Sequence, residues 1–184
     1  MPATTRTARA CALALAGLGL TASTMTALPA TAAPGGGPST RETAPVTSTA
    51  EARKPSAKRR VALRVLSARN TAMRQRGDAY AYGAAGPSRF DCSGLIHYSF
   101  RRAGFAVPRT SSAQAGFARR VAKKDMRPGD LMFFHGSGGV YHAAIFLRWS
   151  RGHALMLHSP GSGQRVRVAV PWTSQWFGGT LRRA

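Results

Sequence analysis

The chain has 184 residues, which is enough for one modest folded domain. Its 27 Lys and Arg residues outnumber 6 Asp and Glu residues, so the formal net charge is +21 at pH 7. This charge favours polyanionic partners. The basic residues are scattered, without the aromatic-studded stripe of single-strand binders, so we expect no nucleic-acid recognition.

Residues 1–32 have the pattern of a secretory signal peptide. Arg6 and Arg9 precede an apolar run that is too short and too rich in small residues to favour a membrane span. Ala30-Thr31-Ala32 then fits a cleavage site between small residues. We expect cleavage here, with an uncleaved anchor as the alternative. Cys11 begins the apolar run and should leave with the peptide.

Export would bring the positively charged chain to the polymers of the cell envelope and away from nucleic acid. Removing Arg6 and Arg9 leaves 25 basic against 6 acidic residues, or +19. The expected partners are therefore anionic cell-wall polymers, and the expected location is secreted or wall-associated, with no stable membrane insertion of the mature chain.

Residues 33–57 are rich in Pro, Gly, Ser, Thr and Ala and have almost no large apolar side chains. They cannot bury enough surface to order themselves, so we predict a disordered linker. Residues 58–184 can hold one modest core and are predicted to form the folded domain, as a monomer.

Helices are predicted first in this domain. Apolar residues at helical spacing predict a helix over 58–76, which Gly77 stops. A glycine-punctuated loop follows. Asp91 can then cap a second helix from Cys92 to Ala103. A further short helix is expected near residues 111–118.

Strands are predicted after residue 130. Residues 131–134, 153–158 and 165–170 read as strands, and 140–149 is apolar on both faces, as in a covered central strand. Helices followed by a run of strands indicate an α+β fold, with helices packed on an antiparallel sheet. We expect Trp172, Trp176 and Phe177 to pack at the edge of this sheet, with a wall-binding surface as the alternative.

Cys92 is the one cysteine expected in the exported protein, which suggests intermolecular pairing or chemistry. The first turn of a helix favours a thiolate. A nucleophilic thiol needs a histidine base and a polar group that orients it; His142 and His158, on neighbouring predicted strands, are candidates. A buried, inert cysteine remains the simpler interpretation of that residue alone. One Cys and two His without a spacing signature do not indicate zinc, so we expect no metal or cofactor.

Four segments in order carry a resemblance to a known family. They are the loop "DAYAYGAAGP", the cysteine segment "FDCSGLIHYSFRRAGFAVPRTSSAQ", the strand pair "MRPGDLMFF" with "VYHAAIFL", and "MLHSPGSGQRVRV". Over about residues 62–182 the chain resembles the NlpC/P60 cell-wall peptidases. The resemblance implies a papain-like fold whose nucleophile lies at a helix N-terminus. It also implies a cysteine endopeptidase acting on peptidoglycan stem peptides, typically at the bond from γ-D-glutamate to a diamino acid.

The same resemblance implies roles for individual residues. Cys92 would be the nucleophile, His142 the base and acid, and His158 the orienting group. The residues implied to bind the amino end of the substrate are Tyr80, Asp91, Ser93 and Ser111.

Three questions stay open at this stage. The stretch between His142 and His158 is longer than is typical of the family, which keeps His153 as a rival third member. The same triad would also suit an amidase or acyltransferase acting on wall or lipid substrates. The charge alone would suit a non-catalytic basic protein that binds the cell wall.

Overall fold

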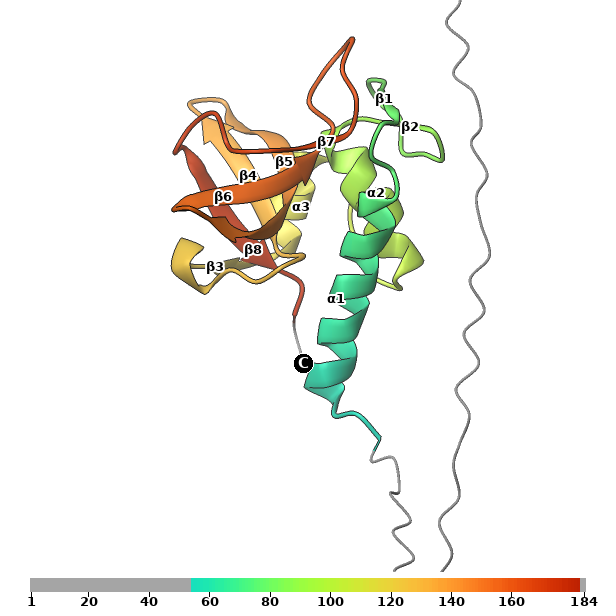
Figure 1. The fold of residues 1–184 in the computed structure, drawn as a ribbon, viewed down its shortest axis with the longest axis vertical. Coiled ribbons are helices and arrows are strands. Elements are labelled where there is room, and N and C mark those ends of the chain that lie inside the picture. The colour runs from blue at the N-terminus through green and yellow to red at the C-terminus, as the bar shows by residue number, and fades with distance from the viewer. Residues whose placement is uncertain (1–53, 183–184) are drawn as a thin grey trace, which may run out of the picture. The chain divides into compact units, whose positions relative to one another are not determined.

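The computed structural model describes residues 54–182, with helices first and strands after them (Figure 1). The predicted signal peptide at 1–32 and residues 33–53 of the predicted linker lie outside the described residues. No helix within 54–182 is long and apolar enough to cross a membrane.

Within residues 54–182, three α-helices and one 3-10 turn form the helical part. They are α1 (Ala57–Met73), α2 (Cys92–Arg102), α3 (Ser111–Phe117) and the turn η1 (Lys123–Asp125). The side chain of Ser56 accepts a hydrogen bond from the Arg59 amide, so α1 begins one residue before the predicted start of the domain. It ends at Met73, and a turn leads to Gly77.

Six antiparallel strands form one sheet in the order β3-β8-β4-β5-β6-β7. Their bounds are β3 Arg119–Val121, β4 Leu131–Gly136, β5 Gly139–Ser150, β6 His153–His158, β7 Arg167–Ala169 and β8 Trp176–Thr180. A separate parallel pair joins β1 (Ala79–Tyr80) to β2 (Arg89–Phe90). The predicted α+β class with an antiparallel sheet is confirmed.

The structure corrects one expectation about the sheet. Strand β8, which contains Trp176 and Phe177, lies between β3 and β4 and is therefore an internal strand. The backbone of Trp172 precedes this strand, and its side chain is 55% exposed. The three aromatic residues therefore do not form a packed edge.

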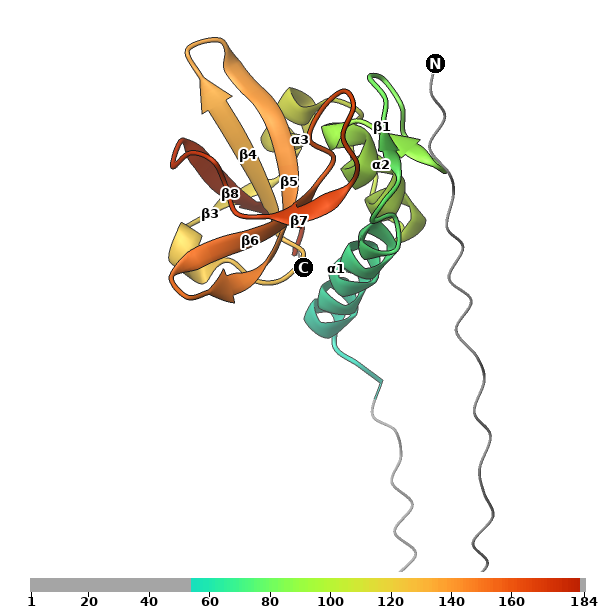
Figure 2. The ribbon, with the colours of Figure 1, turned by 45° about the horizontal axis from the view of Figure 1, so that its top comes forward.

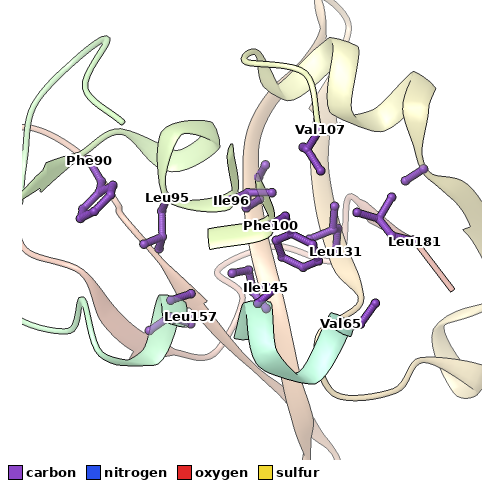
Figure 3. Packing of buried hydrophobic residues seen from close by; sticks show 14 of the residues in the cluster. Val65, Phe90, Leu95, Ile96, Phe100, Val107, Leu131, Ile145, Leu157 and Leu181 are labelled. Atoms are coloured by element: carbon purple, nitrogen blue, oxygen red, sulfur yellow. The ribbon is translucent and has the colours of Figure 1, made fainter. Parts of the chain in front are cut away.

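Side chains of the central strands alternate between two apolar layers. The layer toward the helices contains Leu131, Ile145 and Leu157, together with Val65 of α1 and Phe100 of α2 (Figure 3). The layer on the opposite face is the second cluster of buried residues; its members are Met126, Met132, Phe134, Ala144, Phe146, Ala154, Met156 and Trp176. Both faces of β5 are therefore buried at its centre, as its continuous apolar pattern predicts.

The packing of helices on the sheet places the candidate site. α2 and α3 both pack against β5, while α1 packs on α2 (Figures 1 and 2). The start of α2 carries Cys92, and β5 carries His142. The Ala143 amide of β5 donates a hydrogen bond to the Cys92 sulfur, so the fold brings the start of α2 next to the segment of β5 that carries His142.

Candidate active site

The start of α2 is fixed by Asp91 and Gly94. The Asp91 Oδ1 atom accepts a hydrogen bond from the Gly94 amide at 2.6 Å, so the predicted cap is present. A Cβ atom at Gly94 would overlap the carbonyl oxygen of Ala84. Only glycine therefore lets the preceding loop approach the helix closely enough to frame Cys92, the first residue of α2.

Arg109 is a member of the site that sequence reasoning missed. Its guanidinium donates to both carboxylate oxygens of Asp91, at 2.6 Å to Oδ2 and 3.0 Å to Oδ1. It also donates to the Ser93 hydroxyl at 3.0 Å. The only signal in the sequence is an arginine inside "PRTSS", 18 residues from Asp91. Such a separation does not predict an ion pair without the fold.

Both oxygens of Asp91 are thus occupied by the protein itself. Burial alone raises the pKa of this carboxyl, but hydrogen bonds from Arg109 and from the amides of Gly94 and Gly83 outweigh it. The pKa of Asp91 therefore lies below its ordinary value, and the group is a carboxylate at neutral pH. A substrate ammonium would have to share this carboxylate with Arg109.

The structure brings His142 and His158 together. The Nε2 atom of His142 lies 3.0 Å from the Nδ1 atom of His158, and both side chains are buried. His153, the rival third member, is exposed at the opposite end of β6, where it pairs with Ser150. The geometry therefore selects His158 over His153 as the neighbour of His142.

Both histidines are held neutral. Burial and the neighbouring His158 lower the pKa of His142 to about 3, while burial and the Arg167 charge lower the pKa of His158 to about 4. In one of the two tautomers of this pair, His142 donates its Nε2 proton to His158. That tautomer leaves Nδ1 of His142 unprotonated, which a general base requires. The other nitrogen of His158, Nε2, is buried without a hydrogen-bond partner among the described residues.

Trp172 covers this histidine pair and was not predicted as part of the site. Its ring centroid lies 5.2 Å from that of His142 and 5.7 Å from that of His158. The indole also stacks on Phe134 with a centroid separation of 4.5 Å and an interplanar angle of 9°. Trp172 therefore shields the His142–His158 hydrogen bond from one side, although its own outer face is exposed.

The Cys92 thiol is half-buried. Its position at a helix start predicts a lowered pKa, but the pKa in the structure is raised. Burial raises the pKa of Cys92 and the Asp91 charge raises it further, against hydrogen bonds from the Ala143 and Ser93 amides that lower it. The net shift is upward. Both groups are therefore neutral at rest, the thiol because its pKa is raised and the His142 imidazole because its pKa is lowered.

We expect this neutral thiol to react slowly with iodoacetamide at neutral pH, because alkylation requires the thiolate. The rate should rise with pH to a midpoint above the ordinary thiol pKa. Peptide mass mapping would follow Cys92 separately from Cys11, the other cysteine of the chain. A fast plateau that persists below pH ~6, well under an ordinary thiol pKa, would contradict this expectation and indicate a preformed ion pair.

The lowered histidine pKa values also predict acid sensitivity. Both groups titrate near 6.5 when unfolded, so their neutral burial stabilises the fold above that pH. This stability is lost as the pH falls toward the folded values of about 4 and about 3. The melting temperature should therefore drop between about pH 7 and about pH 4.5, and less so in His158→Asn. A flat profile for the wild-type protein would contradict the assignment.

A pocket of about 490 Å³ opens at the thiol. It is lined by Cys92 and by all four residues predicted to bind substrate, together with further side chains; the lining is Tyr80, Tyr82, Gly83, Asp91, Cys92, Ser93, Arg109, Thr110, Ser111 and Tyr141. Burial raises the pKa of Tyr80, and so do the nearby Cys92 and Asp91. Residues 54–182 contain no group of three His, Cys, Asp or Glu side chains that could hold a metal ion.

The family of the chain follows from comparison with known proteins. The model of the NlpC/P60 family matches residues 77–182, which include the capped cysteine and both buried histidines. The chain belongs to the NlpC/P60 family. Among curated relatives, the Mycobacterium tuberculosis protein named "Probable endopeptidase Rv2190c" is 43% identical over 103 residues. That match covers 56% of this chain but only 25% of the relative, so the chain spans about a quarter of its length.

Solved NlpC/P60 structures share the fold. The peptidoglycan hydrolase RipB of M. tuberculosis is 28% identical with a TM-score of 0.58, and the match covers 71% of this chain and 69% of RipB. RipD of the same organism, described as a non-catalytic domain adapted to peptidoglycan binding, is 26% identical with a TM-score of 0.53. That match covers 64% of this chain and 97% of RipD. The fold alone therefore does not separate catalysis from binding.

Proposed function

We propose that the chain is a secreted cysteine endopeptidase that hydrolyses peptidoglycan stem peptides, at the bond from γ-D-glutamate to a diamino acid. The observation that carries the proposal is the buried His142–His158 hydrogen bond on the strand whose next residue, Ala143, donates its amide to Cys92 at the start of α2. Residues that can act as nucleophile, base and orienting group thus lie on α2, β5 and β6, which supports the proposal. The substrate is proposed from family membership, and export from the sequence of residues 1–32.

The first half of the reaction forms an acyl-enzyme. As the Cys92 sulfur attacks the scissile carbonyl carbon, its proton passes to Nδ1 of His142. The carbonyl oxygen becomes an oxyanion, and the Cys92 amide can donate to it because N–H groups in the first helical turn lack intrahelical acceptors. The C–N bond then breaks, and His142 returns the proton to the leaving amine.

The second half releases the acyl group. A water molecule gives a proton to His142 and attacks the thioester carbonyl; the C–S bond then breaks, and His142 passes the proton to the departing sulfur. The products are a carboxylic acid and the regenerated Cys92 thiol. His158 accepts a hydrogen bond from the Nε2–H group of His142 throughout. This hydrogen bond keeps the His142 imidazole in one orientation and one tautomer.

The pocket at the thiol supports recognition of the amino end of the stem peptide. Tyr80, Asp91, Ser93 and Ser111 all line it. Because Arg109 already pairs with Asp91, we assign Asp91 first to shaping the helix start and only jointly with the hydroxyl groups to substrate binding.

Mass spectrometry of muropeptides incubated with the full chain tests the proposal, with Cys92→Ala as the matched control. A new pair of fragments split after γ-D-glutamate, absent with Cys92→Ala, is the expected result. Products of another mass would indicate an amidase or acyltransferase using the same triad.

One other function has a specific observation in its favour. RipD is a non-catalytic relative, and the net charge of +21 suits anionic wall polymers. Binding of wild type and Cys92→Ala to cell-wall sacculi, without turnover by a wild-type protein whose thiol is reduced, would replace the enzymatic proposal by a wall-binding one.

A further inference from the structure

A second groove lies on the sheet face that points away from the helices. Its volume is about 470 Å³, and it runs between the β5–β6 hairpin, the segment after β7 and the turn η1. We call it the tryptophan groove; its lining is Lys123, Trp149, Gly152, His153, Ala154, Val170, Pro171, Trp172, Thr173, Ser174 and Trp176. All three tryptophans of the chain are in this lining.

Exposed apolar side chains concentrate at this groove and at the thiol pocket. Six large hydrophobic side chains among residues 54–182 are exposed. Trp149, Val170 and Trp172 line the tryptophan groove, while Tyr82 and Tyr141 line the thiol pocket. The sixth, Leu63 on α1, lines neither the groove nor the pocket. Because water-exposed indole is unfavourable and clustered apolar exposure marks binding surfaces, the groove has the composition of a ligand site.

The polar groups of the groove define the ligand class. Lys123 donates one hydrogen bond to the Ser174 carbonyl at 2.9 Å and lies 4.2 Å from the Trp176 ring centroid, which leaves further N–H donors. His153 and Thr173 add side chains that can both donate and accept. The lining contains no Asp or Glu, so nothing in it would pair with a cationic diamino acid.

We propose that the tryptophan groove binds sugar rings of a neutral polysaccharide strand. A pyranose ring presents C–H groups on its face and hydroxyl groups at its edge. The indole faces carry negative potential and suit the C–H groups of the sugar ring. The polar groups at the rim of the groove can hydrogen-bond to its hydroxyl groups. A peptide with free carboxylates and ammonium groups would find only one cation and no anion there.

Trp172 joins the groove to the catalytic residues. The same indole that lines the groove lies over the rings of His142 and His158. Trp172 is therefore shared by the groove and by the surroundings of the histidine pair. Resting on the proposed function, this shared side chain identifies the strand as the glycan that carries the stem peptides.

Titration of the full chain with the tetramer of N-acetylglucosamine tests the groove directly. All three tryptophans line it, so fluorescence and indole N–H resonances report on the groove. Trp149 is its specific reporter, because Trp172 also lies over the histidine pair. We expect a saturable change, and Trp149→Ala should weaken binding about tenfold through the lost stacking. Leu63→Ala, an exposed change on α1, is the control and should bind as wild type does. Melting curves would check that both variants are folded.

Two results would overturn the groove assignment. One is the absence of any saturable change with the tetramer in folded wild-type protein. The other is a sugar-free stem peptide that shifts the Trp149 indole resonance and competes with the tetramer. The measurement needs no cleavage. A protein that binds the tetramer but cleaves nothing would therefore refute only the proposed hydrolysis. A protein that cleaves stem peptides but does not bind the tetramer would refute only the groove.

Discussion

Replacing His142 by glutamine is expected to lower kcat/KM for cleavage of a defined stem peptide by about 10³-fold or more. Glutamine is polar and can still hydrogen-bond to His158, but it cannot accept the Cys92 proton. Because burial raises the pKa of Cys92, little of the thiol ionises at neutral pH without a base. The loss should therefore be larger than in an enzyme that holds a preformed thiolate. Steady-state rates by chromatography would measure it.

Two further variants give this prediction its controls. Cys92→Ala combined with His142→Gln should be no slower than either single change, since the two groups act as a unit. His135→Gln alters an exposed histidine on β4 that lies beside Phe177, and it should cleave at the wild-type rate. A His142→Gln rate within a few-fold of wild type would exclude His142 as the base.

Most of the fold could be predicted from the sequence because its signals are local. Asp91 followed by an apolar helical pattern predicts where α2 begins, and the unbroken apolar run of β5 predicts a strand buried on both faces. Strand β8 escaped prediction because "WFGGT" has two glycines and no alternation of apolar and polar residues. Its place in the sheet comes from pairing with β3 and β4.

The parts of the site that could not be predicted depend on contacts between distant segments. Arg109 reaches Asp91 only because the loop before α3 folds back over the start of α2. Trp172 reaches the histidines from a segment with no regular structure. The helix start at Cys92 favours a thiolate, but the burial that opposes it is a property of the packed fold.

Replacing Asp91 by alanine is expected to lower the free energy of unfolding by about 3 kcal/mol. The change removes the cap on α2 and the acceptor for the Gly83 amide, and it leaves the Arg109 guanidinium without its counterion. The Arg109 side chain is 33% exposed, so water offsets part of the loss and the cost stays below that of a fully buried pair. Urea denaturation monitored by circular dichroism would measure it.

Three comparisons separate the contributions of Asp91. Asp91→Asn keeps an oxygen for the cap but loses the charge, so it should cost less than alanine. Asp125→Ala removes an exposed carboxylate and should change stability by no more than about 0.5 kcal/mol. The double change with Arg109→Ala should cost less than the sum of the single changes, because the two side chains are partners. An Asp91→Ala protein as stable as Asp125→Ala would show that this ion pair does not hold the start of α2.

Lowering the pH tests the contribution of Asp91 to stability without a mutation. The lowered pKa of Asp91 means that its contribution is present above an ordinary carboxyl pKa and is lost as the pH falls through the folded value. The contribution of the histidine pair begins to fall earlier, near pH 6.5, and is lost toward the folded values of about 4 and about 3, so the two windows overlap only at low pH. Acid unfolding should therefore proceed in two ranges, and Asp91→Asn should remove part of the lower range and leave the upper one in place.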